Sequence, residues 1–278
     1  MIVVIVRTPR LHNFANVFVT SLALTDAIVG LATLIGGTAF VVVEPSDWMF
    51  EKIQAAFTVC YMGTTFGSFL HVAVIAIERY AYIVHPFWYY RWINKQLVTI
   101  ILASTWILVA VYTLIISIIL QNSFVCLFDA FTHLDIFYVD SCISLLLLSL
   151  TLMAYFRIAV LSLKHRRSVT AVNVAVLSAS NVTQRAGIRT NLQENSWRDV
   201  RKTLSFYLVM TGSLAAFTFP LTVFALLARF SSKMDTNVLT LFMFLPILQS
   251  GFNFFIFIFM SSDFKQVVHN LFLGCFVN

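Results

Sequence analysis

The sequence predicts an all-α membrane protein, a seven-transmembrane helix bundle whose first helix is truncated and which ends in a short amphipathic helix. Of its 278 residues, 60% are apolar and only 11% are charged, whereas soluble domains carry about 25% charged residues. Charge is also absent from long stretches, and a helix needs only about 20 apolar residues to cross the bilayer. Four runs of at least 25 residues contain no Asp, Glu, Lys or Arg: 53–77, 96–128, 203–228 and 236–262.

The elements follow in order from a short apolar stub at Met1–Val6. Six helical residues rise only about 9 Å, too little for a span or a signal peptide. We therefore interpret the stub as the inner end of a helix whose outer part is not in this sequence. Asp26 interrupts the first complete span, and Asp140 and Arg157 lie near the ends of the fourth. The six complete spans are expected near 14–43, 53–83, 97–120, 136–163, 203–228 and 238–260.

The connecting segments predict the orientation. Fifteen of the 18 Lys and Arg residues lie on one side of the predicted spans, and the positive-inside rule places that side in the cytoplasm. The C-terminus is then cytoplasmic and the N-terminus extracellular, and the net charge of +6 reflects topology and not nucleic-acid binding. We expect one domain over 1–278, with a disordered, partner-binding cytoplasmic loop at 164–202 and the amphipathic helix at 262–274.

Several polar or helix-breaking residues occupy the spans at regular places. Asp26 lies in the sequence Leu-Ala-Leu-Thr-Asp, Glu78-Arg79-Tyr80 closes the next span, and Pro86 follows seven residues after Arg79. Further along are Trp106, Pro220, and Asn253 four residues before Phe257. Together, in this order and on these spans, they resemble the rhodopsin-like (class A) G-protein-coupled receptors. The resemblance covers the whole chain and places the missing first-helix Asn just before Met1.

The resemblance implies a receptor of the plasma membrane that passes an extracellular signal to a heterotrimeric G protein. Arg79 would pair with Glu78 in one state and reach the G protein in another, with Tyr80, Tyr155 and Pro220 completing the switch. An ordinary positive-inside anchor is the alternative for Arg79. The sequence departs from the family where Thr218 replaces the sixth-helix Trp and where Phe254 and Phe257 replace Pro and Tyr; Asp199 approximates the usual acidic partner of the Arg.

A sodium site and a ligand pocket are also implied. In the family, the positions of Asp26, Ser68 and Asn253 hold Na⁺; a protonated Asp26 bonded to its neighbours is the alternative. We expect no other cofactor. Tyr61 stands where amine receptors carry an Asp, which predicts a lipid-like, peptide or weakly charged ligand. The pocket residues by spacing are Tyr61, Met62, Thr65, Thr222 and Met243, which would otherwise simply pack the bundle.

The four cysteines and His71 leave alternatives open. Cys60–Cys126 and Cys126–Cys142 are both candidate disulfides, and neither pairing is required. Cys275 is a candidate for lipidation or a free thiol. We expect His71 to be a hydrogen-bonded core residue and not a metal ligand.

Three kinds of function remain to be compared. The departures from the family at Thr218, Phe254 and Phe257 favour an alternative to a signalling receptor. This alternative is a signalling-impaired scaffold or partner subunit. A transporter or channel would show inverted repeats or broken helices with ionisable residues at the midplane, and only Asp26 fits that description. No nucleophile–base set or His-rich metal motif within the spans suggests an enzyme.

Overall fold

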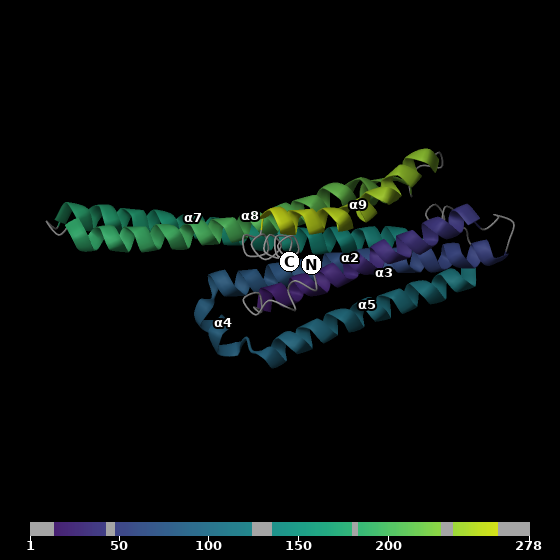
Figure 1. Ribbon diagram of the computed structural model, residues 1–278, viewed down its shortest axis with the longest axis horizontal. Coiled ribbons are helices and arrows are strands. Elements are labelled where there is room, and N and C mark those ends of the chain that lie inside the picture. Colours follow the sequence, from purple (N-terminus) through teal and green to yellow (C-terminus); the bar gives the residue numbers. More distant parts are fainter. Residues whose placement is uncertain (1–13, 43–47, 124–134, 180–182, 229–235, 261–278) are drawn as a thin grey trace, which may run out of the picture.

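The computed structural model describes residues 14–42, 48–123, 135–179, 183–228 and 236–260, and within these ranges the chain forms helices and no strands (Figure 1). Five of the six predicted complete spans are confirmed as helices that are long and apolar enough to cross a membrane. The sixth lies in the last helix, whose apolar stretch, Phe244–Met260, is shorter. The helices are α2 Phe14–Val42, α3 Trp48–Val84, α4 Pro86–Trp92, α5 Lys95–Ser123, α7 Asp135–Ala179, α8 Thr183–Ala228 and α9 Thr236–Met260.

The predicted long loop is helical instead. α7 runs through to Ala179 and α8 begins at Thr183, so the backbone of 164–202 is helical except at 180–182, outside the described residues. This segment contains no Pro and only Gly187 as a strong helix breaker, which explains why its polar composition does not end the helices. Figure 1 shows α7 and α8 side by side, extending well past the other helices. The stub at 1–6 and the helix expected at 262–274 lie outside the described residues.

α3 is the central element of the bundle. About 61% of its most apolar stretch is buried, against 17–39% in the other four long spans. α2, α5 and α7 all pack on α3, while α9 packs on α2 and α8. Gly63 faces Thr113 of α5 so closely that a Cβ would collide with it, and Gly67 lies tightly between Thr25 and Val109. Small residues let transmembrane helices approach in this way.

Two apolar clusters fill the interior, one toward each end of α3. At the Arg79 end, the larger cluster gathers residues from α2, α3, α5, α7, α8 and α9 around Leu22, Ile75 and Leu214. At the Tyr61 end, a smaller cluster joins α3, α5, α7 and α8 through Met62, Ile116, Leu120, Phe137 and Leu221. The polar side chains described below lie within and beside these two clusters.

Local signals define the turn between α3 and α5. α3 ends at Val84 because His85, which precedes Pro86, takes an extended φ of −126°, as residues before proline prefer. Pro86 opens α4, where its missing N–H costs nothing. Asn94 then caps α5, since its Oδ1 accepts a hydrogen bond of 2.8 Å from the Leu97 N–H.

Candidate functional site

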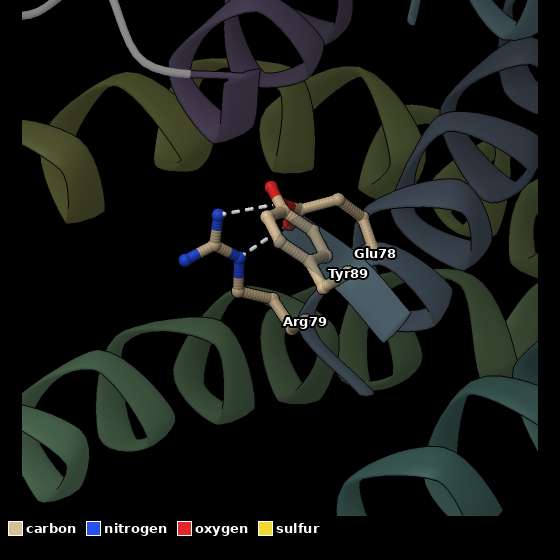
Figure 2. A network of polar contacts seen from close by, with 3 residues as sticks. All are labelled: Glu78, Arg79 and Tyr89. Carbon is tan, nitrogen blue, oxygen red and sulfur yellow. Dashed lines mark hydrogen bonds and ion pairs between the residues drawn. The ribbon is translucent and has the colours of Figure 1, made fainter. Parts of the chain in front are cut away.

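An ion pair between sequence neighbours closes the end of α3. The Arg79 guanidinium donates to both carboxylate oxygens of Glu78, with Nε at 2.5 Å and a terminal nitrogen at 3.0 Å (Figure 2). Tyr89 of α4 donates its hydroxyl to the same carboxylate at 2.6 Å. The Glu78 and Arg79 side chains are only 6% and 13% exposed. The three residues, which we call the Arg79 lock, therefore form a largely buried unit that ties α4 to α3.

Aromatic rings surround the guanidinium of the Arg79 lock. Its central carbon lies 5.4 Å from the ring centres of both Tyr82 and Tyr207, within the range of cation–π attraction. Tyr207 comes from α8, so α8 also contacts the lock. Tyr155 stacks on Tyr207 at 6.5 Å, and its buried hydroxyl has no hydrogen-bond partner among the described residues. The predicted contact of Tyr155 with Arg79 stays a prediction.

Two further members of the predicted switch lie apart from the ion pair. Tyr80 packs its ring edge-on against His85, with centroids 5.9 Å apart. Pro220 lies inside α8, where proline removes one backbone hydrogen bond. The side chain of Asp199, the approximate acidic partner, lies outside the described residues. The structure thus brings Glu78 and Arg79 together and leaves the roles of Tyr80, Tyr155 and Pro220 as predictions.

Tyr89 lies outside the membrane-spanning segments, and its surroundings disfavour ionisation. Burial raises the pKa of the Tyr89 hydroxyl above its usual value, and the hydrogen bond to Glu78 and the charge of that carboxylate raise it further. The nearby Arg79 guanidinium opposes the rise without cancelling it. Tyr89 is therefore a stable hydrogen-bond donor to Glu78.

The predicted sodium ligands come together in part. The Asp26 carboxylate of α2 accepts hydrogen bonds from Ser250 at 2.7 Å and Asn253 at 3.0 Å, both on α9. Asn253 Oδ1 is buried without a hydrogen-bond partner. Ser68 and Ser250 line one small cavity between the helices. An unpartnered amide oxygen beside a carboxylate and hydroxyls is a donor set that suits a hard cation. The residues fit Na⁺, and the ion itself stays a prediction.

The predicted ligand pocket exists as a cavity at the Tyr61 end. Tyr61, Met62, Thr65 and Thr222 all line it, which gathers four of the five predicted residues around one space. The side chain of Met243 lies outside the described residues. Asp140, Ser141, Ser144, Thr218 and Pro246 join them from α7, α8 and α9. Whether the cavity binds a ligand stays a prediction.

A second carboxylate–tyrosine pair includes Asp140, which lines this cavity. Asp140 of α7 accepts a hydrogen bond of 2.5 Å from the Tyr112 hydroxyl of α5. Phe66 of α3 stacks on the Tyr112 ring with centroids 4.3 Å apart. The hydrogen bond thus joins two helices that both pack on α3. We call Asp140 and Tyr112 the Asp140 pair.

His71 belongs to a core network, as expected. Its Nε2 lies 2.8 Å from the Ser21 hydroxyl, which also accepts a hydrogen bond of 2.9 Å from the Trp106 indole. Its Nδ1 lies 2.7 Å from the Gly67 carbonyl, which can only accept. We therefore assign the proton to Nδ1, with the Ser21 hydroxyl donating to Nε2. The network ties α2, α3 and α5 together.

The cysteine predictions receive a partial correction. Cys60 and Cys142 are exposed free thiols in the structure, so neither candidate disulfide forms there. Their outward-facing positions on α3 and α7 turn the sulfur atoms away from the packed interior. Cys126 and Cys275 lie outside the described residues, and lipidation of Cys275 stays a prediction.

Comparison with known proteins decides the family. Residues 1–257 match the family model described as 7 transmembrane receptor (rhodopsin family). The chain belongs to this family. The receptor is accordingly a multi-pass membrane protein, and its family consists of receptors and not enzymes. The sequence resemblance and the predicted all-α, seven-transmembrane fold class are both confirmed, while the truncated first helix and the C-terminal amphipathic helix stay predictions.

Individual relatives match shorter parts of the receptor. It is 29% identical over 109 residues to a melatonin receptor type 1C of Xenopus laevis, covering 39% of the chain and 26% of the relative. It is 32% identical over 108 residues to an octopamine receptor beta-2R of Chilo suppressalis, covering 38% and 27%. Dopamine receptor 2 of Drosophila melanogaster is 28% identical over 114 residues, covering 38% and 20%. The chain thus aligns with between a fifth and about a quarter of the length of these relatives.

Several residues of the sites escaped the sequence analysis, among them Ser250, Tyr89, Tyr207 and Tyr112. Ser250 lies one helical turn before Asn253, and that spacing on one helix face was a signal that could have identified it. Tyr89, Tyr207 and Tyr112 had no such signal, because each reaches its partner from another helix. Their roles depend on helix packing that no local pattern encodes.

Proposed function

We propose that the receptor passes an extracellular ligand signal to heterotrimeric G proteins by opening the Arg79 lock. The observation that carries this proposal is the ion pair of Glu78 and Arg79 at the end of α3, held by Tyr89 and covered by Tyr207. We place this end in the cytoplasm, from the distribution of Lys and Arg, and the N-terminus outside the cell at the plasma membrane.

The lock has the properties of a two-state element. Arg79 donates to a carboxylate of its own helix, so releasing it requires no movement along α3. Tyr207 is the contact that depends on α8, and a shift of α8 would uncover the guanidinium. A free guanidinium presents five N–H donors in a fixed plane, suited to carbonyl or carboxylate oxygens of a partner protein.

α8 also connects the lock to the cavity at the Tyr61 end. Thr218, Leu221 and Thr222 of α8 line that cavity. Tyr207 lies earlier on the same helix, about three turns before Thr218. A ligand that displaces the cavity side of α8 would therefore act on the helix that covers Arg79. The relatives named as receptors for melatonin, octopamine and dopamine support the proposal that this receptor also has a ligand.

Nucleotide exchange on purified Gα subunits tests the proposal with the receptor in lipid nanodiscs. We expect the receptor to accelerate GDP release from at least one Gα class without added ligand, and Glu78→Gln to increase that rate. Arg79→Ala should abolish the acceleration. Arg91→Ala removes an exposed positive charge from α4 at the same end and should retain it. Exchange that is absent with every Gα class, or unchanged by Arg79→Ala, would sink the proposal.

One observation favours a second candidate, a partner subunit that does not signal itself. Phe257 is 2% exposed and packs edge-on against Phe206 of α8, with centroids 5.5 Å apart. The family has a tyrosine hydroxyl at the Phe257 position, and here the contact between α8 and α9 is purely apolar. Phe257→Tyr distinguishes the candidates, since a gain of nucleotide exchange only in this variant would support the partner subunit.

A further inference from the structure

The cavity at the Tyr61 end holds a negative group without a cation. Asp140 is the only acidic residue that lines it, and none of the lining residues is basic. The ion pair of Glu78 and Arg79 lies at the other end of α3. Asp140 receives the Tyr112 hydroxyl on Oδ1, and no described side chain donates to Oδ2. A partly buried carboxylate within a membrane span is costly, and such residues mark binding sites.

Several hydroxyl groups around Asp140 are committed as donors to the backbone. Thr65 donates to the Tyr61 carbonyl at 2.8 Å, Thr222 to the Phe219 carbonyl at 2.8 Å, and Thr218 to the Leu214 carbonyl at 2.6 Å. Each hydroxyl has one hydrogen and two lone pairs. Their oxygens are therefore left to act as acceptors, and with Asp140 they make the cavity rich in acceptors.

Tyr61 supplies a further polar group that lacks a partner. Its hydroxyl is buried without a hydrogen bond, and it lines the same cavity within electrostatic range of Asp140. A buried hydroxyl without a hydrogen bond destabilises the folded state, because it has lost its bonds to water. A ligand group that donates several hydrogen bonds would satisfy the Tyr61 oxygen and the Asp140 carboxylate together.

We propose that this cavity binds the protonated amine of a ligand, with Asp140 as its counter-ion. An ammonium group has three donors and no acceptor, which matches one free carboxylate oxygen and the surrounding hydroxyl oxygens. An anionic or carbonyl ligand would find a carboxylate and few free donors. The counter-ion then comes from α7, while Tyr61 on α3 serves as a neutral acceptor.

The size and lining of the cavity define what fits beside Asp140. Its free volume is about 30 Å³, above the roughly 10–15 Å³ that one water molecule needs. That space admits the ammonium end of a ligand beside Asp140. Met62, Phe69, Phe137 and Leu221 provide apolar walls, so we expect the rest of the ligand to be apolar where it adjoins the amine. The inference rests on the proposed function, because a receptor must hold its ligand.

Thermal unfolding of the receptor in nanodiscs tests the cation directly, without the natural ligand. Methylammonium chloride and tetramethylammonium chloride are compared at equal ionic strength and neutral pH. Both ions carry one charge, and only methylammonium has N–H groups that can donate to Asp140 and the surrounding oxygens. We expect methylammonium to raise the unfolding midpoint by about 2–4 °C, the shift for a ligand at a few times its dissociation constant.

Two variants assign the effect to its residue. Asp140→Asn keeps an oxygen for the Tyr112 hydroxyl and should eliminate the difference between the two salts. Tyr138→Phe alters an exposed side chain on the same helix and should retain that difference. Equal midpoints of the wild-type receptor in the two salts would overturn the proposal, and so would a difference that survives in Asp140→Asn.

A double-mutant cycle provides a second measurement that needs no added ion. Met62→Lys places an ammonium group in the cavity, and Asp140 should make it tolerable. We expect Met62→Lys to lower the unfolding midpoint in both backgrounds. The decrease should be smaller by at least about 2 °C when Asp140 is present than in the Asp140→Asn background. Equal losses in the two backgrounds would overturn the proposal.

Failure of this inference is distinguishable from failure of the proposed function. The salt and lysine experiments measure unfolding only and involve no G protein. Loss of nucleotide exchange in Arg79→Ala with no response to methylammonium would support the proposed G-protein coupling and contradict the proposed amine site. A methylammonium response with no nucleotide exchange on any Gα class would support the cation site and contradict the proposed G-protein coupling.

Discussion

Glu78 and Asp140 are both carboxylates that accept a hydrogen bond from a tyrosine of another helix, at opposite ends of α3. Tyr89 donates to Glu78 at 2.6 Å and Tyr112 donates to Asp140 at 2.5 Å. Only Glu78 also holds a guanidinium, from Arg79. The Arg79 lock therefore carries its own cation, whereas the Asp140 pair has a carboxylate and a donor but no cation among the described residues.

The difference separates a closed polar unit from an open one. In the Arg79 lock each partner satisfies the others, so change requires breaking contacts that already exist. In the Asp140 pair a group from outside can complete the contacts. A closed lock at one end and a cavity with an unmet charge at the other are what a receptor needs for restraint and recognition.

Removing the cation of the lock should have the largest effect on stability. Arg79→Ala leaves Glu78 buried without its charge partner, and breaking a buried ion pair in this way costs about 3–5 kcal/mol. We expect the unfolding midpoint in nanodiscs to fall by about 10 °C, since 1 kcal/mol corresponds to about 2–4 °C. Arg91→Ala, on the exposed side of α4, serves as control and should shift it by less than about 2 °C. Similar shifts for both would mean that the lock is not a buried unit.

Removing the tyrosine donor should matter more in the open pair than in the lock. Tyr112→Phe takes away the only described donor to Asp140, and hydrogen bonds to charged groups contribute about 1.5–3 kcal/mol. We expect a loss of about 2 kcal/mol, measured by thermal unfolding. A loss smaller than that for Tyr89→Phe would contradict the comparison, because Glu78 retains two bonds from Arg79.

Tyr89→Phe should cost about 1 kcal/mol at neutral pH, since Glu78 keeps its Arg79 partner. The effect should also depend on pH. The raised pKa of Tyr89 in the folded state means that the unfolded chain ionises first, at pH about 10. Stability from this group is complete below that pH and is lost as the pH rises. The difference in free energy of unfolding between wild type and Tyr89→Phe should be smaller at pH about 10.5 than at pH about 8. Tyr90→Phe, an exposed neighbour, should show no gap at either pH.

Neutralising the open carboxylate should have the smallest effect on the free receptor. Asp140→Asn orphans no cation and leaves an oxygen for the Tyr112 hydroxyl, so we expect a change within about 1 kcal/mol. Chemical unfolding of the two proteins at neutral pH measures it. A loss as large as that for Arg79→Ala would show that Asp140 already has a cationic partner, which would remove the contrast.

The sequence was sufficient to predict the positions of the spans and the contacts between residues that are close in the chain. Long apolar runs with few or no charges located the five spans that the structure confirms, and Glu78 and Arg79 were paired because they are adjacent. The family spacing gathered Tyr61, Met62, Thr65 and Thr222, which line one cavity. These successes share one cause, since helix periodicity and chain distance fix which residues share a face or a depth.

Contacts between helices escaped prediction where they depend on rotation and depth. Tyr207 of α8 covers Arg79, a contact that the sequence did not predict. Asp140 was noted only as a charge near the end of a span, and Tyr112 of α5, its partner, is 28 positions away. The segment 164–202 was misjudged because polar composition suggested a loop, while the scarcity of breakers favoured helix.

The extension of α7 and α8 beyond the bundle gives the receptor a lever arm. From Pro220 to the start of α8 at Thr183, 37 residues span about 55 Å. A bend of about 10° at the proline, where a helix most readily kinks, would displace the far end by roughly 10 Å. A small movement of α8 at the cavity would thus become, at the tip, a displacement as large as the diameter of a helix.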